Sequence, residues 1–234
     1  MINVKYKHYY EIDSCVDNTL SRKLHNDWAQ KSFTLFLRIK TNFKEIKKKN
    51  YENKTCCVIG KRGKHLGLMI IDNIYKFDFW TNYNGEEYYN QVPITILDDN
   101  IEYLNIFVSH DEENKLIELF LYDEQNDKKL LNSTKYKGEM LDYSKSPTFI
   151  GCATDNNTNE FPHNYFWAGN ITYLKLIDKY VNSEELIDLI YFDISDIQNF
   201  KNQDAYFIFD GNRKTDISIF DLSNNNNHAR LKKL

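Results

Sequence analysis

The sequence predicts an all-β protein built as an antiparallel sandwich or barrel, and three observations support this fold class. The run SFTLFLRIK has a period of two, which places Phe33, Leu35 and Leu37 on one face of a strand. Similar runs recur roughly every ten to fifteen residues, separated by turn signals such as GKRGK, NYNGEE and DEQNDKK. Because helical segments do not alternate with these runs, we expect antiparallel neighbours and not βαβ units.

Strand-like runs follow SFTLFLRIK along most of the chain and share a high content of aromatic and β-branched residues. In order, they are TCCVIG, HLGLMII, NIYKFDFW, VPITIL, EYLNIFVS, KLIELFLYD, TFIGC, NITYLKLID and AYFIFD. The prolines at 93, 147 and 162 lie near strand starts or in loops, where a missing N–H group is tolerated.

One helix is expected, near Ser183–Phe192 in the run NSEELIDLIYF. Asn182 or Ser183 can cap it, and glutamates follow in the first turn, where the helix dipole favours negative charge. Leu186 and Ile187 begin an apolar face. We therefore expect about three turns packed on the edge of the sandwich.

Composition limits the class of protein. The chain has 234 residues, of which 41% are hydrophobic, enough to bury one large core, and we expect a single domain over 1–234. The formal net charge of −4 argues against a nucleic-acid partner, which requires a concentrated basic face. No apolar run has the roughly 18 residues that a membrane span needs. No signal peptide is visible, so we expect a protein that is cytoplasmic or released without one.

The cysteines are expected to be free thiols in a reducing compartment. Cys56 and Cys57 are adjacent and would point to opposite faces of a strand, so they are poor disulfide partners. Cys15 and Cys152 complete the set, and their spacing matches no CxxC pair or zinc motif.

The order of these pieces resembles a known family. SFTLFLRIKT, VIGKRGKHLGLMI, YKFDFW, LFLYDEQND, PTFIGCATDNN and YFWAGNITYLKLIDKYVNSEELIDLIY follow one another as in the laminin-G-like, concanavalin A-like lectin and glucanase jelly rolls. The resemblance covers about residues 32–191. It implies an antiparallel two-sheet jelly-roll sandwich with one short helix.

The motif DLSNNNNHARL near the C-terminus also resembles this family, in which it opens the domain instead of following the helix. Either the chain is circularly permuted, with 204–234 completing the sheet beside the N-terminal strand, or residue 204 begins a second, truncated domain. We favour permutation, because a lone fragment could not bury Phe207 and Phe209. Permutation predicts that His228–Leu231 pairs in the sheet.

Two aromatic loops are candidate ligand sites, because sugars stack on aromatic faces while amides and carboxylates bond their hydroxyls. The ligand-binding candidates in FWTNYNGEEYYNQ and FPHNYFW are Trp80, Tyr83, Tyr88, Tyr89, His163, Tyr165 and Trp167. Tyrosine-rich loops equally suit a protein interface. The alternation in YKFDFW indicates that about half of such aromatics belong to the core.

Two loops supply oxygen ligands suited to Ca²⁺, which takes roughly six to eight of them. The candidates are Asp155 and Asn157 in one loop, and Asp221, Ser223 and Asn225 in the C-terminal motif. Some members of the family hold calcium at the sandwich edge, as the resemblance implies. The alternative is that Asp221 and Ser223 form side-chain turns that cap backbone donors.

Catalysis is not favoured. The glucanases of this fold carry a Glu-x-Asp-x-x-Glu strand, and the nearest string here, EIDSCV, has Glu11 and Asp13 but Val16 in place of the second glutamate. We therefore expect a non-catalytic module that binds a glycan through edge loops. The alternative is a protein-interaction or assembly module of a toxin complex, particle or surface structure, and a glycan-active enzyme is third. The sequence leaves the oligomeric state open.

Overall fold

The computed structural model describes residues 1–5, 7–12, 31–41, 55–61, 63–71, 74–82, 89–96, 101–136, 138–140, 147–153, 165–186, 205–215, 218–223, 225 and 227–233. Regular structure within these ranges consists of strands. They are β1 (Ile2–Val4), β2 (His8–Ile12), β3 (Phe33–Lys40), β4 (Thr55–Lys61), β5 (Lys64–Ile71), β6 (Ile74–Asn82), β7 (Tyr89–Ile96), β8 (Tyr103–Asp111), β9 (Leu116–Asp123), β10 (Lys128–Lys135), β11 (Thr148–Ile150), β12 (Gly169–Ile177), β13 (Ala205–Lys214), β14 (Ser218–Asp221) and β15 (Ala229–Lys233). The all-β prediction is confirmed.

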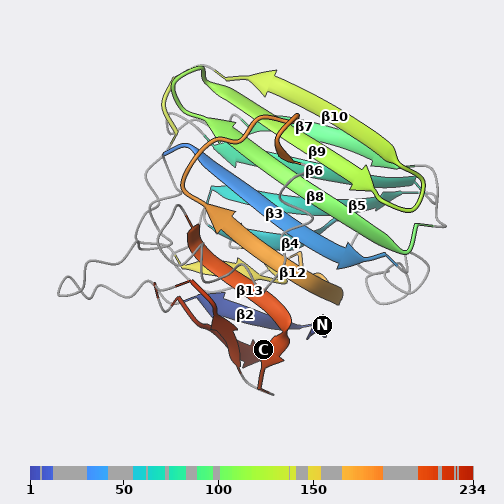
Figure 1. Cartoon of the computed structure of the whole chain (residues 1–234), viewed down its shortest axis with the longest axis vertical. Coiled ribbons are helices and arrows are strands. Elements are labelled where there is room, and N and C mark those ends of the chain that lie inside the picture. The colour runs from blue at the N-terminus through green and yellow to red at the C-terminus, as the bar shows by residue number, and fades with distance from the viewer. Residues whose placement is uncertain are drawn as a thin grey trace.

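The strands form two layers that belong to one hydrogen-bonded path. The order is β10-β9-β8-β3-β12-β13-β14-β15-β2-β11-β4-β5-β6-β7, with β1 added to β12, and neighbouring strands pair antiparallel. In Figure 1, β10, β9, β8, β3 and β12 form the front layer, and β4 to β7 lie behind it. The two ends of the path also meet, because the Asn132 side-chain amide on β10 donates to the Pro93 carbonyl on β7 at 2.8 Å. The sheet is therefore nearly closed.

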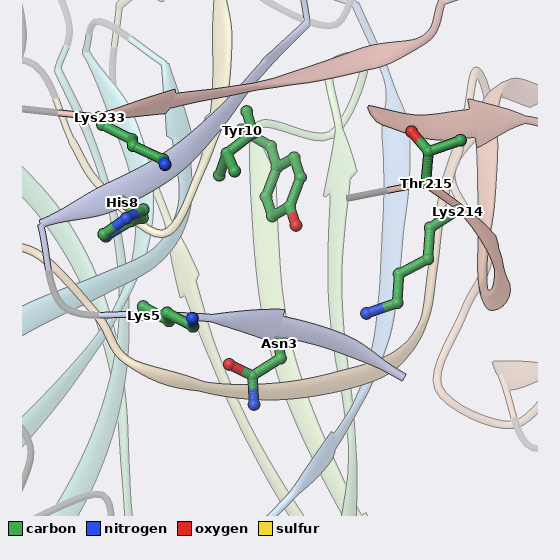
Figure 2. Close-up of a pocket in the computed structure, with 8 residues that line it drawn as sticks. Asn3, Lys5, His8, Tyr10, Lys214, Thr215 and Lys233 are labelled. Carbon is green, nitrogen blue, oxygen red and sulfur yellow. The ribbon is translucent and has the colours of Figure 1, made fainter. Parts of the chain in front are cut away.

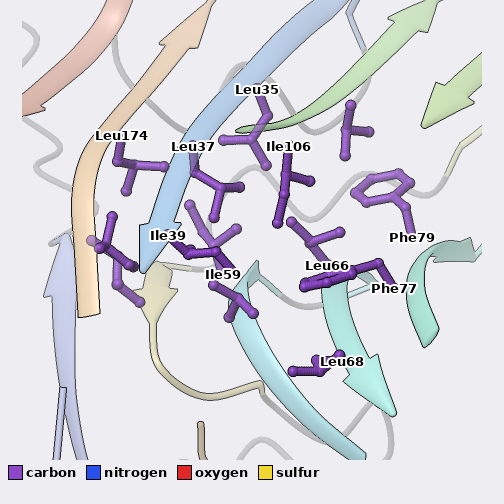
Figure 3. Packing of buried hydrophobic residues seen from close by; sticks show 14 of the residues in the cluster. Leu35, Leu37, Ile39, Ile59, Leu66, Leu68, Phe77, Phe79, Ile106 and Leu174 are labelled. Carbon is purple, nitrogen blue, oxygen red and sulfur yellow. The ribbon is translucent and has the colours of Figure 1, made fainter. Parts of the chain in front are cut away.

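The core lies between these layers. Leu35, Leu37 and Ile39 of β3 are fully buried, as the period of two predicts, and they face Leu66 and Phe77 of the rear layer (Figure 3). Burial of these apolar side chains supplies the main stabilisation of the fold. Among the described residues no helix is long and apolar enough to cross a membrane.

The helix predicted near Ser183–Phe192 is not found among the described residues. In this part of the chain the description stops at residue 186. Its capping turn is present, because the Asn182 side-chain oxygen accepts from the amides of Glu184 and Glu185 at 2.9 and 3.1 Å. Leu186 is buried against the outer face of β3, β8 and β9. Residues 187–192 lie outside the described ranges, so the helix itself stays a prediction.

The C-terminal strands complete the path between the two layers. β13 pairs with β12, and β15 pairs with β2 in the register that sets Ala229 opposite Ile12. Ile219 of β14 and Ala229 are fully buried in the core. The pairing predicted for His228–Leu231 is thus found for Ala229–Lys233. The extent of one domain over 1–234 stays a prediction.

The described cysteines are free thiols, as expected. Cys56, Cys57 and Cys152 are buried, and burial raises the pKa of Cys56 to about 12. Their thiolate forms are therefore suppressed at neutral pH. Cys15 lies outside the described residues.

His110 on β8 is a buried neutral imidazole. Its Nδ1 lies 2.9 Å from the Lys31 carbonyl, and its Nε2 lies 2.7 Å from the Tyr136 hydroxyl. The neutral ring satisfies both partners when Nδ1 donates to the carbonyl and Nε2 accepts from the hydroxyl. Burial, followed by the charge of Lys64, lowers the pKa of His110 to about 3.

This burial predicts a loss of stability in acid. A folded-state pKa below the unfolded value near 6.5 means that the unfolded chain binds the proton first, so stability is full above that value and falls as pH decreases toward 3. Between pH 7.5 and 5.0 we expect His110 to account for a loss of about 2 kcal/mol in the free energy of unfolding. Urea unfolding at both pH values measures it. His110→Gln should lose less on acidification, and an equal loss in both proteins contradicts the account.

Candidate functional site

The predicted aromatic loops are only partly described. Tyr83, Tyr88 and His163 lie outside the described residues, and of Tyr89 only the backbone is described, at the start of β7. Trp80 lies near the end of β6, half-buried, with its ring centroid 3.6 Å from that of His65. The edge-loop site that these residues would form therefore stays a prediction.

Tyr165 and Trp167 lie in one short segment but differ sharply in solvent exposure. Tyr165 is 40% exposed and has a φ of 63°, and its carbonyl accepts from the Cys57 amide at 2.6 Å. Trp167 is 0% exposed and belongs to the core. The assignment of Trp167 to a ligand site is wrong, because a sugar cannot stack on an indole that is fully covered.

Only some of the predicted calcium ligands lie among the described residues. Asp155 and Asn157 lie outside the described residues, whereas Asp221, Ser223 and Asn225 share the turn after β14. In the part of the chain that the structure describes, no group of three or more His, Cys, Asp or Glu side chains gathers as a metal site would.

Both Asp221 oxygens are used by protein donors. Oδ1 accepts from the amides of Ile208 and Ser223, each at 2.9 Å. Oδ2 accepts from the Ser223 hydroxyl at 2.7 Å and from the Asn227 amide at 2.9 Å. Burial raises the pKa of Asp221, while these hydrogen bonds oppose the shift. Such a carboxylate fastens β14 and the turn to β13, which supports the side-chain-turn alternative.

A basic pocket lies where the first two strands meet the last three, and it has a volume of about 460 Å³. Its lining residues are Asn3, Lys5, His8, Tyr10, Lys214, Thr215, Leu231 and Lys233. Figure 2 shows Tyr10 in the middle of this set, with Lys214 on one side and His8 and Lys233 on the other. Among the described residues of this lining there is no carboxylate.

Strand register explains one wall of the basic pocket. On the paired strands β2 and β15, Tyr10 lies opposite Leu231 and His8 lies opposite Lys233. Because side chains alternate along a strand, these four residues share one face of the sheet. Tyr10 is nearly buried, at 4% exposure, whereas Lys233 is exposed. The wall thus has an aromatic floor and a charged rim.

The β13–β14 turn supplies the opposite wall. The Thr215 amide donates to the Ser218 carbonyl at 2.8 Å, and the Ser218 amide donates to the Thr215 hydroxyl at 3.1 Å. This reciprocal pair closes the turn directly after Lys214. The position of the Lys214 backbone is therefore fixed while its side chain stays exposed.

β1 forms the third wall, and Gly211 allows its close approach to β13. A Cβ atom at position 211 would lie 2.6 Å from the Met1 Cα, and the Met1 ammonium donates to the Gly211 carbonyl at 2.7 Å. The Asn3 side-chain amide donates to the Asn170 side-chain oxygen at 2.8 Å. No local sequence pattern indicates this site, because its residues come from opposite ends of the chain and lie mainly on strands.

Comparison with known proteins shows the fold. No family model matches the chain, and no curated protein matches it. Among solved structures, the Ruminococcus gnavus IT-sialidase CBM40 is 16% identical, with a TM-score of 0.55, covering 80% of this chain and 95% of that one. Its complexes with α2,3- and α2,6-sialyllactose give TM-scores of 0.56 and 0.53 at 15% identity with the same coverage. The chain has the concanavalin A-like jelly-roll fold that the sequence resemblance implies.

We predict that Asp221 stabilises the fold without a metal. Asp221→Asn replaces an acceptor with an NH₂ donor facing backbone amides, so the free energy of unfolding should fall by about 1–3 kcal/mol. Urea unfolding in excess CaCl₂ and in EDTA provides the measurement. Equal losses in both buffers support the turn, and a loss seen only with calcium would establish the metal site instead.

Proposed function

We propose that this chain is a non-catalytic carbohydrate-binding module and that the basic pocket holds the saccharide. The observation that carries the proposal is the pocket itself, whose volume of about 460 Å³ lies within the usual range of small-molecule sites. Its lining combines the donors and acceptors that sugar hydroxyls require with the apolar surface that their C–H faces require.

The polar groups surround an apolar floor. The Asn3 amide, the Thr215 hydroxyl and the Tyr10 hydroxyl are hydrogen-bonding groups, and the Tyr10 ring and Leu231 provide apolar contact. A saccharide presents the same two kinds of surface, hydroxyls on its edge and C–H groups on its faces. The match is one of chemistry and size, and it does not select a particular sugar.

The pocket does not support glycoside hydrolysis. That chemistry uses two carboxyl groups about 5–9.5 Å apart, one of them acting as an acid. Of the residues considered from the sequence, Glu11 lies on β2 directly after the pocket-facing Tyr10, and its carboxylate lies 4.0 Å from the Lys232 ammonium. Since side chains alternate along a strand, Glu11 faces away from the basic pocket. This supports binding without catalysis.

The fold likeness adds support of a different kind. The CBM40 module with a similar fold is bound to sialyllactose in two solved structures, so a sandwich of this kind can carry a saccharide site. At 15% identity that ligand cannot be transferred to this chain. The alternative of a protein-interaction module stays a prediction, since single exposed aromatics such as Phe220 are normal on protein surfaces.

We predict that blocking the pocket abolishes glycan binding. Asn3→Trp fills the pocket from an exposed position, and on a glycan array it should reduce binding by about tenfold or more relative to wild type. Ser133→Trp, on the exposed edge strand β10, is the matched control. Trp80→Ala tests the edge-loop site predicted from the sequence, and we expect it to keep binding.

Two results would oppose the proposal. Loss of binding in Trp80→Ala but not in Asn3→Trp would move the site to the edge loop. If wild type binds no saccharide on the array, the carbohydrate proposal fails. Light scattering with size-exclusion chromatography would then test the assembly alternative. Circular dichroism of each variant separates lost binding from lost folding.

A further inference from the structure

The basic pocket gathers positive charge from three separate segments of the chain. Lys5 follows β1, Lys214 ends β13, and Lys233 lies on β15. All three side chains are exposed, and they lie around one concavity (Figure 2). His8 lines the same concavity, opposite Lys233 in the strand register. The whole protein has a net charge of −4, so this local concentration runs against its overall composition.

Two described acidic residues near the pocket strands, Glu11 and Asp210, make other contacts. Glu11 faces the other side of β2, near Lys232. The Asp210 carboxylate accepts from the Asn212 amide at 2.9 Å and is nearly buried. Within the described residues, Lys5, Lys214 and Lys233 form no ion pair. No described carboxylate is therefore paired with these three ammonium groups.

Neighbouring like charges destabilise a fold unless a counter-charge relieves them. The Met1 ammonium lies within reach of this charge: burial and then the charge of Lys214 lower its pKa, while the charge of Asp210 opposes the shift. A concave surface with one sign of charge focuses the electrostatic potential and attracts ligands of opposite sign. An anionic group in the pocket would meet ammonium groups from several directions, each with three N–H donors.

We propose that the basic pocket selects saccharides that carry an anionic group, whether carboxylate, sulfate or phosphate. The inference rests on the proposed function for the saccharide part of the ligand, and on the three lysines for the anionic part. Lysine binds an anion as a point charge and does not impose the planar geometry that arginine does. The shared chemistry is therefore the negative charge, and the pocket accepts a planar carboxylate or a tetrahedral sulfate.

Isothermal titration calorimetry with ligands of one scaffold tests this inference. Lactose is the neutral probe, 3′-sialyllactose carries a carboxylate, 3′-sulfolactose carries a sulfate, and sodium sulfate supplies the anion alone. We expect both acidic saccharides to bind at least tenfold more tightly than lactose. Their affinities should fall as sodium chloride is raised, because salt screens exposed charges.

Variants that remove one charge each test whether the preference for acidic saccharides arises in the basic pocket. Lys5→Gln, Lys214→Gln and Lys233→Gln each remove a charge at an exposed position, and each should weaken acidic saccharides by about 3- to 10-fold. Affinity for lactose should fall by a smaller factor than affinity for the acidic saccharides, because lactose carries no charge. Lys128→Gln on the exposed edge strand β10 is the matched control and should change neither. Thermal melting of each variant confirms that the fold is retained.

The possible outcomes separate the two proposals. Equal affinity for lactose and the acidic saccharides overturns the anionic inference and leaves the carbohydrate proposal standing. Binding of sulfate without any saccharide overturns the carbohydrate proposal, and the pocket is then an anion site of another kind. No binding of any probe overturns both. Acidic selectivity that survives all three lysine substitutions overturns the assignment to this pocket.

Discussion

The pairing of β15 with β2 is the constraint on which the rest of the structure depends. It joins the two ends of the chain in one sheet and continues the hydrogen-bonded path from the front layer to the rear layer. The same register places His8 opposite Lys233 and Tyr10 opposite Leu231, which are four residues of the basic pocket. The same strand pairing therefore joins the two layers and positions one wall of the candidate site. A shift of one residue in this register would turn all four side chains to the other face.

Two local devices hold this arrangement in place. Asp221 connects β13, β14 and the following turn through hydrogen bonds to three backbone amides and one hydroxyl. Gly211 lets β1 approach β13 closely enough for the Met1 ammonium to reach its carbonyl. The asparagine-rich motif DLSNNNNHARL thus contains the turn that leads from β14 to β15, which pairs with β2. Leu231, the last residue of this motif, lines the basic pocket.

Sequence periodicity predicted the strands with alternating burial, such as β3, where Leu35 and Leu37 face the core. It missed β10, because KKLLNSTK is an exposed edge strand with little apolar content, and it missed the short strands β1 and β2. Trp167 was misassigned because YFWAG does not reveal which aromatic faces inward. The basic pocket was invisible for another reason: Lys5, Lys214 and Lys233 meet only through long-range pairing, and local pattern carries no information about that meeting.

The central proposal is that the two ends of the chain form a site for an acidic saccharide. The most direct measurement is an NMR titration of ¹⁵N-labelled protein with 3′-sialyllactose. The account predicts that the largest amide shifts occur at Asn3, Lys5 and His8 and at the opposing residues of β13 and β15. Shifts confined to the region of Trp80 and Tyr165, with those at the chain ends unchanged, would contradict it.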